Sequence, residues 1–248
     1  MQPFSYRSYN GKTAYGQNVI GVYNPRAKRR ILLAAHWDTR WGTDEADVNK
    51  DQPNDGANDG ASGVAILLEL ARQIKKMDSF DLGVDIIFFD AEDQGVPKGR
   101  EQEDPQNRSW CIGSRYWAHL PHQPNYQAEY GILLDMVGAQ NAVFYREGMS
   151  AQSAPELQRR VWAIARALGS TSFRDSLSVS VIDDHLPIIN ALHIPMLDIV
   201  ELNAKKPHFG AYHHTHLDNL GIIDKETLQQ VGRVVLQVVV LENQRAKE

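Results

Sequence analysis

Short apolar runs that end in charged residues recur along the chain and predict buried strands. The clearest run is Ile86-Ile87-Phe88-Phe89, which is followed by Asp90, Glu92 and Asp93. Runs of β-branched and aromatic residues of this length are typical of a strand that is covered on both faces. By the same reasoning we expect further strands at Asn18–Tyr23, Arg30–Ala35, Tyr130–Asp135, Val143–Tyr145 and Met196–Val200.

Apolar residues spaced three and four apart predict helices between these strands. The first predicted helix starts near Val64, ends near Lys75 and Lys76, and has its apolar face at Val64, Leu67, Leu68, Ala71 and Ile74. Later helices are predicted up to Leu120, over Glu156–Leu168, up to Ala191, and from Lys225 to Asn243 with Asp224 as its cap. Strands and helices therefore alternate, which predicts an α/β fold with one site along an edge of the sheet.

Composition favours a soluble globular protein. The chain has 248 residues and no Pro/Gly/Ser-rich linker, so we expect a single domain over residues 1–248. A net charge of −5 argues against a general nucleic-acid binder. The one cysteine, Cys111, excludes an intrachain disulfide and is expected to be a buried thiol.

Neither a membrane span nor a signal peptide is recognisable in the sequence. No apolar run approaches the roughly 18 residues that a membrane span requires. The start Met1-Gln2-Pro3-Phe4 lacks the basic region and hydrophobic stretch of a signal peptide. The compartment is therefore left open, and an extracytoplasmic or periplasmic location is expected if a leader has been removed.

Acids and histidines at the predicted strand ends are the candidates for chemistry. His36 and Asp38, two residues apart, suit a metal ligand and its orienting carboxylate. Asp59 precedes a helix, and three histidines fall within His213–His216. Polar loops at Thr39–Asn58 and Gln94–Arg108 flank these residues. Solvated loop acids, and for Asp59 an ordinary helix cap, are the alternative interpretations.

Six motifs in the same order resemble the zinc aminopeptidase superfamily. They are His36-x-Asp38, Asn58-Asp59-Gly60, Asp90-Ala91-Glu92-Asp93, Leu134-Asp135, Asp183-Asp184-His185 and His214-Thr215-x-x-Asp218-Asn219. Within the superfamily the chain is most similar to the animal-type glutaminyl cyclases, particularly bacterial members, through LLDMVGA, VIDDHLP, DAED and WCIGS. The resemblance implies a three-layer α/β fold with a mixed, mostly parallel, twisted central sheet flanked by helices.

The resemblance also implies a catalytic zinc and a reaction. One zinc per chain would be held by Asp59, Asp93 and His214, with Glu92 as proton shuttle and with Asp183 and Asp135 as an acidic group beside it. Three protein ligands leave one position open, as a catalytic zinc requires. The implied substrates are peptide or protein N-termini, whose glutamine is cyclised to pyroglutamate with release of ammonia; nucleic acid is not an expected partner.

The sequence leaves two alternative functions open, one that would use the same residues and one that would not. A zinc aminopeptidase would add His36 and Asp135 for a second metal and use Glu92 to activate water. A metal-free binding module would not require the acidic site at all. The sequence leaves the oligomeric state and the peptide preference open.

The chain departs from the animal cyclases at two points. His213 stands where those enzymes have a tryptophan beside the zinc histidine, so the aromatic wall of the pocket is expected to come from Trp110 or Trp41. The sequence also begins at Met1 near the first strand of the family, so we expect the helical segment that usually precedes this strand to be absent, either because the sequence is shortened or because the fold is trimmed.

Overall fold

A six-stranded, mostly parallel sheet forms the centre of the protein. The computed structural model describes residues 1–44, 52–77, 79–206 and 208–247, so residues 45–51 of the predicted loop Thr39–Asn58 lie outside the described residues. The strand order is β1 (Gln2–Arg7), β2 (Thr13–Tyr23), β4 (Gly83–Phe89), β3 (Arg30–His36), β5 (Gly131–Asp135) and β8 (Met196–Val200). The pairs β4/β3, β3/β5 and β5/β8 are parallel, whereas the pairs β1/β2 and β2/β4 are antiparallel. The predicted fold class is confirmed.

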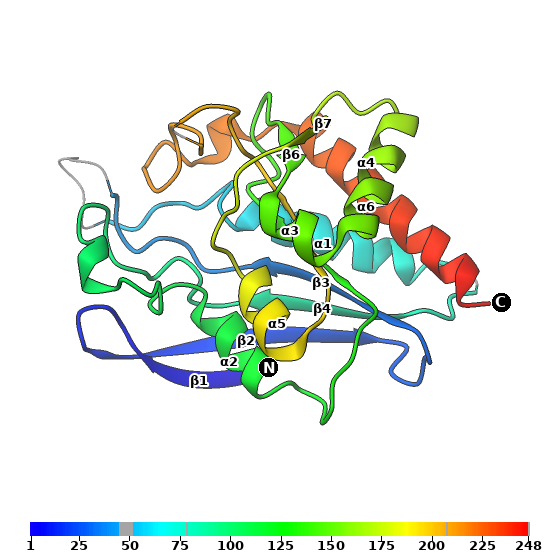
Figure 1. Cartoon of the computed structure of the whole chain (residues 1–248), viewed down its shortest axis with the longest axis horizontal. Coiled ribbons are helices and arrows are strands. Elements are labelled where there is room, and N and C mark those ends of the chain that lie inside the picture. The colour runs from blue at the N-terminus through cyan, green and yellow to red at the C-terminus, as the bar shows by residue number, and fades with distance from the viewer. Residues whose placement is uncertain (45–51, 78, 207, 248) are drawn as a thin grey trace.

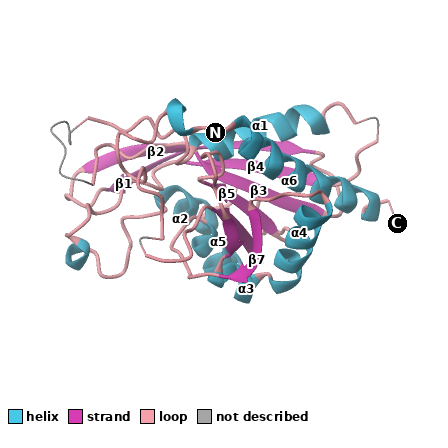
Figure 2. Ribbon diagram, turned by 90° about the horizontal axis from the view of Figure 1, so that it is seen from above, coloured by secondary structure: helices cyan, strands magenta, loops and turns pink. Residues whose placement is uncertain are grey.

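Helices cover both faces of the sheet and complete three layers (Figures 1 and 2). One face carries α1 (Ala61–Ile74), α4 (Pro155–Ala167) and α6 (Lys225–Arg245). The opposite face carries α2 (Ile112–His119) and α5 (His185–Leu192). Because both faces are covered, the central strands read as continuous apolar runs, and all residues of β3 and β5 are buried.

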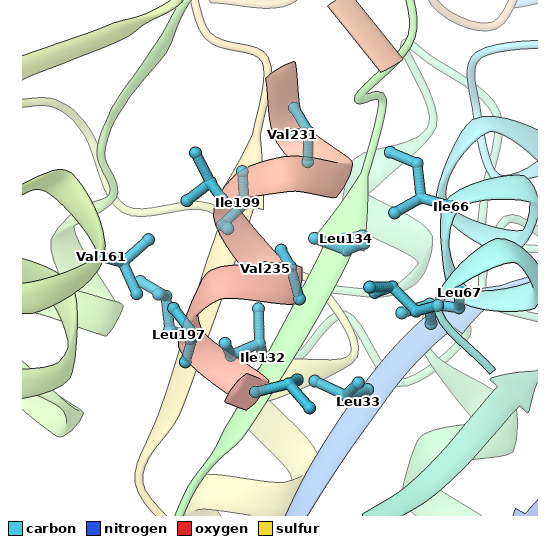
Figure 3. Packing of buried hydrophobic residues seen from close by; sticks show 14 of the residues in the cluster. Leu33, Ile66, Leu67, Ile132, Leu134, Val161, Leu197, Ile199, Val231 and Val235 are labelled. Atoms are coloured by element: carbon cyan, nitrogen blue, oxygen red, sulfur yellow. The ribbon is translucent and has the colours of Figure 1, made fainter. Parts of the chain in front are cut away.

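The larger core lies between the sheet and the helix layer of α1, α4 and α6 (Figure 3). Val231 and Val235 of α6 lie there in one buried cluster with Ile132 and Leu134 of β5. The predicted cap of α6 is confirmed, since the Asp224 carboxylate accepts hydrogen bonds from the backbone N–H groups of Glu226 and Thr227. The N-terminus of α6 is thereby fixed by the local sequence, and the strands beneath cover its apolar face.

The predicted face of the first helix is partly wrong. Leu67 and Ile74 are buried as expected, but Leu68 is 56% exposed and Ala71 is also exposed. The residues of α1 that face the sheet are instead Ile66, Leu67, Leu70 and Ile74. Leu68 and Ala71 line a shallow apolar groove against β2 and β4, which explains why apolar side chains are present on this flank.

Three elements did not show in the hydrophobic pattern. They are β1, the short helix α3 (Gly148–Ser153) and β7 (Phe173–Leu177), which pairs with β6 (Phe144–Arg146) in a separate two-stranded sheet. Only Phe4 of β1 and Phe173 of β7 are buried, so neither strand carries a continuous apolar run. Two 3-10 turns, Glu101–Glu103 and Leu220–Ile222, complete the described elements.

The parallel strands place the chemistry at one edge of the sheet. The carboxyl ends of β3, β4 and β5 lead directly into His36, Asp90 and Asp135. Ligand sites of open α/β sheets lie at this edge. No helix in the described part of the chain is both long and apolar enough to cross a membrane.

Candidate active site

Loops at the carboxyl edge of the sheet bring the predicted acids and histidines together. Every predicted ligand and catalytic residue is buried, with 8% or less of its surface exposed: Asp59, Glu92, Asp93, Asp135, Asp183 and His214. Buried acids require partners or protons. This excludes the interpretation of these side chains as solvated loop acids.

The three predicted zinc ligands meet at His214. Its Nε2 lies 2.8 Å from Asp93 Oδ1 and 3.7 Å from Asp59 Oδ2. Burial alone would raise the pKa of Asp93, but the charge and the hydrogen bond of His214 hold it well below its usual range. Burial alone would lower the pKa of His214, but the charge of Asp93 and hydrogen bonds to Asp44 and Asp93 raise it to about 10.

A second group of donors shares Asp59. His36 Nε2 lies 3.1 Å from Asp59 Oδ1 and 3.1 Å from Asp135 Oδ1. Burial and the charge of Asp93 raise the pKa of Asp59 to about 7, against the opposing effect of His36. Gly60 makes this approach possible, because a Cβ at that position would lie 2.5 Å from the His36 carbonyl oxygen.

Asp38 fixes the turn that carries Glu92 and Asp93. Its two carboxylate oxygens accept the backbone N–H groups of Glu92 (3.0 Å) and Asp93 (3.2 Å). Asp38 Oδ1 also lies 3.6 Å from His36 Nδ1. The expected pairing of His36 with Asp38 is therefore present, but the main hydrogen bonds of Asp38 go to the acid turn.

Glu92 sits in surroundings that favour its protonated form. Burial, followed by the charges of Asp93 and Asp183, raises the pKa of Glu92 well above its usual value. The thiol of Cys111 donates a hydrogen bond to Glu92 Oε1 at 3.2 Å. Burial and the charge of Glu92 raise the pKa of Cys111, so the cysteine is the buried thiol that we expected and not a thiolate nucleophile.

Asp183 lies at the start of α5, within a cluster of further acids. Burial and the charges of Asp135 and Asp184 raise its pKa well above the usual value. The neighbouring His185 lies between Glu147 (Nε2 to Oε2, 3.6 Å) and Asp198 (Nδ1 to Oδ2, 3.8 Å), and all three are fully buried. Sequence reasoning missed Glu147 and Asp198, because neither is adjacent to a recognised motif.

A separate set of hydrogen bonds ties the His214 loop to the Asp59 loop. Asp218 accepts the backbone N–H groups of Asn58 (2.7 Å) and Asp59 (3.0 Å). The Asn58 amide in turn donates to the Tyr212 hydroxyl and accepts the N–H of Gly138. Asn58 and Asp218 therefore hold the two loops together, which explains their presence in the motifs around Asp59 and His214.

Aromatic rings pack around the imidazole of His214. The Trp110 ring lies parallel to it at a centroid distance of 5.7 Å, and the His213 ring stacks on it at 3.6 Å. His213 also stacks on Phe209. Trp41 is 42% exposed and stacks on Tyr9, so of the two predicted wall residues only Trp110 contacts a predicted ligand; the substrate-binding role of both stays a prediction.

The donor chemistry fits a zinc ion. Among the described residues, groups with ligand atoms within 4.8 Å of one another are Asp59/His213/His214, His36/Asp59/Asp135, His36/Glu92/Asp93 and Asp183/His185/Asp198. Imidazole nitrogens and carboxylate oxygens of this kind are ligands that zinc takes in catalytic sites. The buried Asp93 Oδ2 has no hydrogen-bond partner among the described residues, as expected for an atom that binds a cation.

The chain is similar to proteins of known family and structure. The sequence profile of Peptidase family M28 matches residues 18–239. A crystal structure of Tannerella forsythia glutaminyl cyclase is 45% identical with a TM-score of 0.91, covering 96% of this chain and 82% of that one. A Zn-dependent exopeptidase from Parabacteroides distasonis is 42% identical with a TM-score of 0.90, covering 96% and 83%. The glutaminyl-peptide cyclotransferase of Bothrops jararaca is 29% identical over 97% of this chain and 67% of its own length.

Proposed function

The chain belongs to peptidase family M28, and on that premise we propose that it is a zinc-dependent glutaminyl-peptide cyclotransferase. The observation that carries the proposal is a protonatable, buried Glu92 next to the Asp59, Asp93 and His214 donors, in a chain that is 45% identical to a bacterial glutaminyl cyclase. The substrates would be the N-terminal glutamines of peptides or proteins.

We propose one zinc per chain, held by Asp59, Asp93 and His214. Zinc bound there would polarise the side-chain carbonyl of the substrate glutamine. His36 and Asp135 would stay off the metal, hydrogen-bonded to each other at 3.1 Å. A buried cluster of charged side chains suits this arrangement, since buried charges interact more strongly than solvated ones.

Glu92 is the group that moves protons in this proposal. The α-amine of the substrate attacks the side-chain amide carbon, the new C–N bond closes a five-membered lactam, and ammonia leaves. Glu92 in its carboxylate form would take the proton from the attacking amine and give it to the departing nitrogen, and its raised pKa favours holding the proton between these steps. Asp183, whose pKa is also raised, would hydrogen-bond the substrate beside Glu92.

Substrate geometry sets the selectivity that we expect. The α-amine and the side-chain amide belong to one residue, so attack is intramolecular and benefits from proximity. An asparaginyl peptide is one methylene shorter and would have to close a strained four-membered ring. It should therefore not react.

One observation favours a second candidate function. The His36, Asp59 and Asp135 donors form a second group that shares Asp59 with the first, as a two-metal aminopeptidase would require. The Parabacteroides distasonis relative is itself described as an exopeptidase. In that reaction Glu92 would activate a water for peptide hydrolysis.

Two substrates separate the two functions. The purified protein is assayed on a glutaminyl dipeptide and on leucyl amide, with ammonia, blocked N-terminus and free amino acid measured in each. The cyclase releases ammonia and a pyroglutamyl peptide and leaves leucyl amide intact. Faster release of leucine than of pyroglutamyl product, or release of free glutamine from the dipeptide, would replace the cyclase with the peptidase.

A further inference from the structure

Arg40 and Asp44 lie directly behind the imidazole of His214. Asp44 Oδ2 lies 2.7 Å from His214 Nδ1, on the side of the ring opposite to Asp93. The other carboxylate oxygen of Asp44, Oδ1, accepts a hydrogen bond from Arg40 Nη2 at 2.8 Å. The three side chains therefore form a continuous chain of hydrogen bonds that ends at a proposed zinc ligand.

This contact fixes which imidazole nitrogen faces the metal. A carboxylate can only accept, so the contact with Asp44 holds a proton on Nδ1 of the His214 ring. Nε2, which faces the Asp93 and Asp59 carboxylates at 2.8 and 3.7 Å, is then the nitrogen that would bind zinc after giving up its own proton. Metal-binding histidines commonly donate their other ring N–H to a carboxylate, which orients the ring and raises its basicity.

Arg40 also reaches the backbone of a second ligand. Its Nη1 donates to the carbonyl oxygens of Asp93 (2.7 Å) and Gly95 (2.9 Å). Its guanidinium lies over the Trp110 ring at 4.8 Å, and that ring is parallel to the imidazole of His214. Arg40 is 2% exposed. This buried side chain therefore contacts both Asp44, which orients His214, and the backbone of Asp93.

The charge of Arg40 makes a carboxylate at position 44 compatible with the site. The surroundings already hold Asp59, Glu92 and Asp93, and one more unpaired acid would add repulsion in a region of low dielectric. Paired with Arg40, Asp44 contributes an acceptor for His214 without adding net charge. A carboxylate and a guanidinium four residues apart in one loop suit this role.

We propose that Arg40 and Asp44 are positioning residues that set the zinc affinity of the site, Asp44 by orienting His214 and Arg40 by holding Asp44 and the backbone of Asp93. The inference rests on the proposed zinc site. An ordinary surface ion pair between Arg40 and Asp44 would have no effect on zinc affinity. Substitution of such partners typically weakens metal affinity about 10- to 100-fold.

Zinc affinity, measured by competition with a chelating dye in the absence of substrate, tests the proposal. The variants are Asp44→Asn, Arg40→Met and the double variant. Each single variant should weaken zinc binding about 10- to 100-fold, and the double variant should be no weaker than the poorer single one, because both changes break one chain of contacts. Should Arg40→Met fail to fold, Asp44→Asn alone decides.

The matched control is a second buried Arg–Asp pair away from the site. Arg30 Nη1 donates to Asp85 Oδ1 at 2.6 Å, and Asp85 is fully buried. Asp85→Asn should lower the melting temperature but leave zinc affinity unchanged. Unchanged zinc affinity in Asp44→Asn, equal weakening in the control, or fully additive effects in the double variant would each overturn the positioning role.

A further variant separates this inference from its premise. His214→Ala should abolish tight zinc binding if the proposed site is correct. If His214→Ala binds zinc as tightly as the native chain, the zinc site itself is wrong. If His214→Ala loses zinc while Asp44→Asn keeps native affinity, the site stands and the role of Arg40 and Asp44 fails.

Discussion

Replacing Glu147 with glutamine should lower stability in a pH-dependent way. Glu147 precedes α3 and is fully buried. One carboxylate oxygen accepts the backbone N–H groups of Met149 (2.8 Å) and Val181 (3.1 Å). The other accepts the backbone N–H (2.6 Å) and the hydroxyl (2.7 Å) of Ser150. This acid therefore caps a helix and also holds the segment that leads to Asp183.

Two estimates give the size of the effect. An amide nitrogen in place of either oxygen deprives two donors of their acceptor, and hydrogen bonds to a charged group contribute about 1.5–3 kcal/mol each, so the loss is about 3–6 kcal/mol. Burial alone would raise the pKa of Glu147, but His185 and the backbone N–H groups lower it from 4.5 to about 2. At about 1.4 kcal/mol for each pKa unit this corresponds to about 3–4 kcal/mol. Both estimates include 3 kcal/mol, which we take as the expected loss.

The direction of the pH dependence follows from the lowered pKa. A carboxyl whose pKa is lower in the folded than in the unfolded chain stabilises the fold above the unfolded value, here 4.5, and loses this contribution as the pH falls through about 2. Glutamine does not titrate. The stability difference between native and variant chains should therefore be constant near neutral pH and fall below half by about pH 3.

Urea and thermal unfolding of the two chains measure this difference. EDTA is present throughout, so that zinc binding does not contribute to the apparent stability. A loss of about 3 kcal/mol should lower the melting temperature by about 6–12 °C at pH 7. The control is Glu156→Gln, the same change at a side chain that is 86% exposed, which should stay within about 0.5 kcal/mol. A Glu147→Gln difference below about 1 kcal/mol, or one that does not shrink on acidification, would refute the reasoning.

Three further predictions concern the zinc site. Glu92→Gln should keep zinc and lose about 10²- to 10⁴-fold of turnover, because it preserves the shape of the side chain and removes the base; near-normal turnover would exclude the proton shuttle. His214→Ala should lose zinc on dialysis whereas His213→Ala and His216→Ala should mostly keep it, and equal loss in all three would contradict the ligand assignment. Metal analysis of the dialysed native protein should find close to one zinc per chain, and two tightly held ions would favour the aminopeptidase.

The parts of the fold that could be predicted are those whose side chains face a single environment. The strand Met196–Val200 is buried along its whole length and was predicted with the bounds that the structure shows. The helix ending near Asn243 was also predicted, because a cap and a valine stripe occur together. In contrast β1 and β7 lie at edges, where only one residue of each strand is buried, so hydrophobic periodicity is too weak to detect them.

Sequence distance explains which site residues were missed. The motifs around Asp59, Glu92 and Asp93 can be recognised because each is compact in the chain. Asp44, by contrast, reaches His214 across 170 residues of sequence, and Arg40 reaches the Asp93 carbonyl across 53. No local pattern marks either residue, since a polar loop with Arg and Asp is also what an ordinary solvated loop contains.

The histidine cluster at His213–His216 shows what geometry adds to a motif. Three imidazoles in four residues favour metal binding, but the pattern alone does not say which ring takes part. The backbone at His214 adopts φ of 56°, an uncommon conformation for a non-glycine residue, and its ring is the one that reaches Asp93. His216 instead lies 3.2 Å from the Gln52 carbonyl oxygen, and His213 Nε2 lies no closer than 3.9 Å to Asp59. Because His214 faces Asp93 as well as Asp59, whereas His213 faces Asp59 and His216 faces the Gln52 carbonyl, substituting them one at a time distinguishes a ligand from its neighbours.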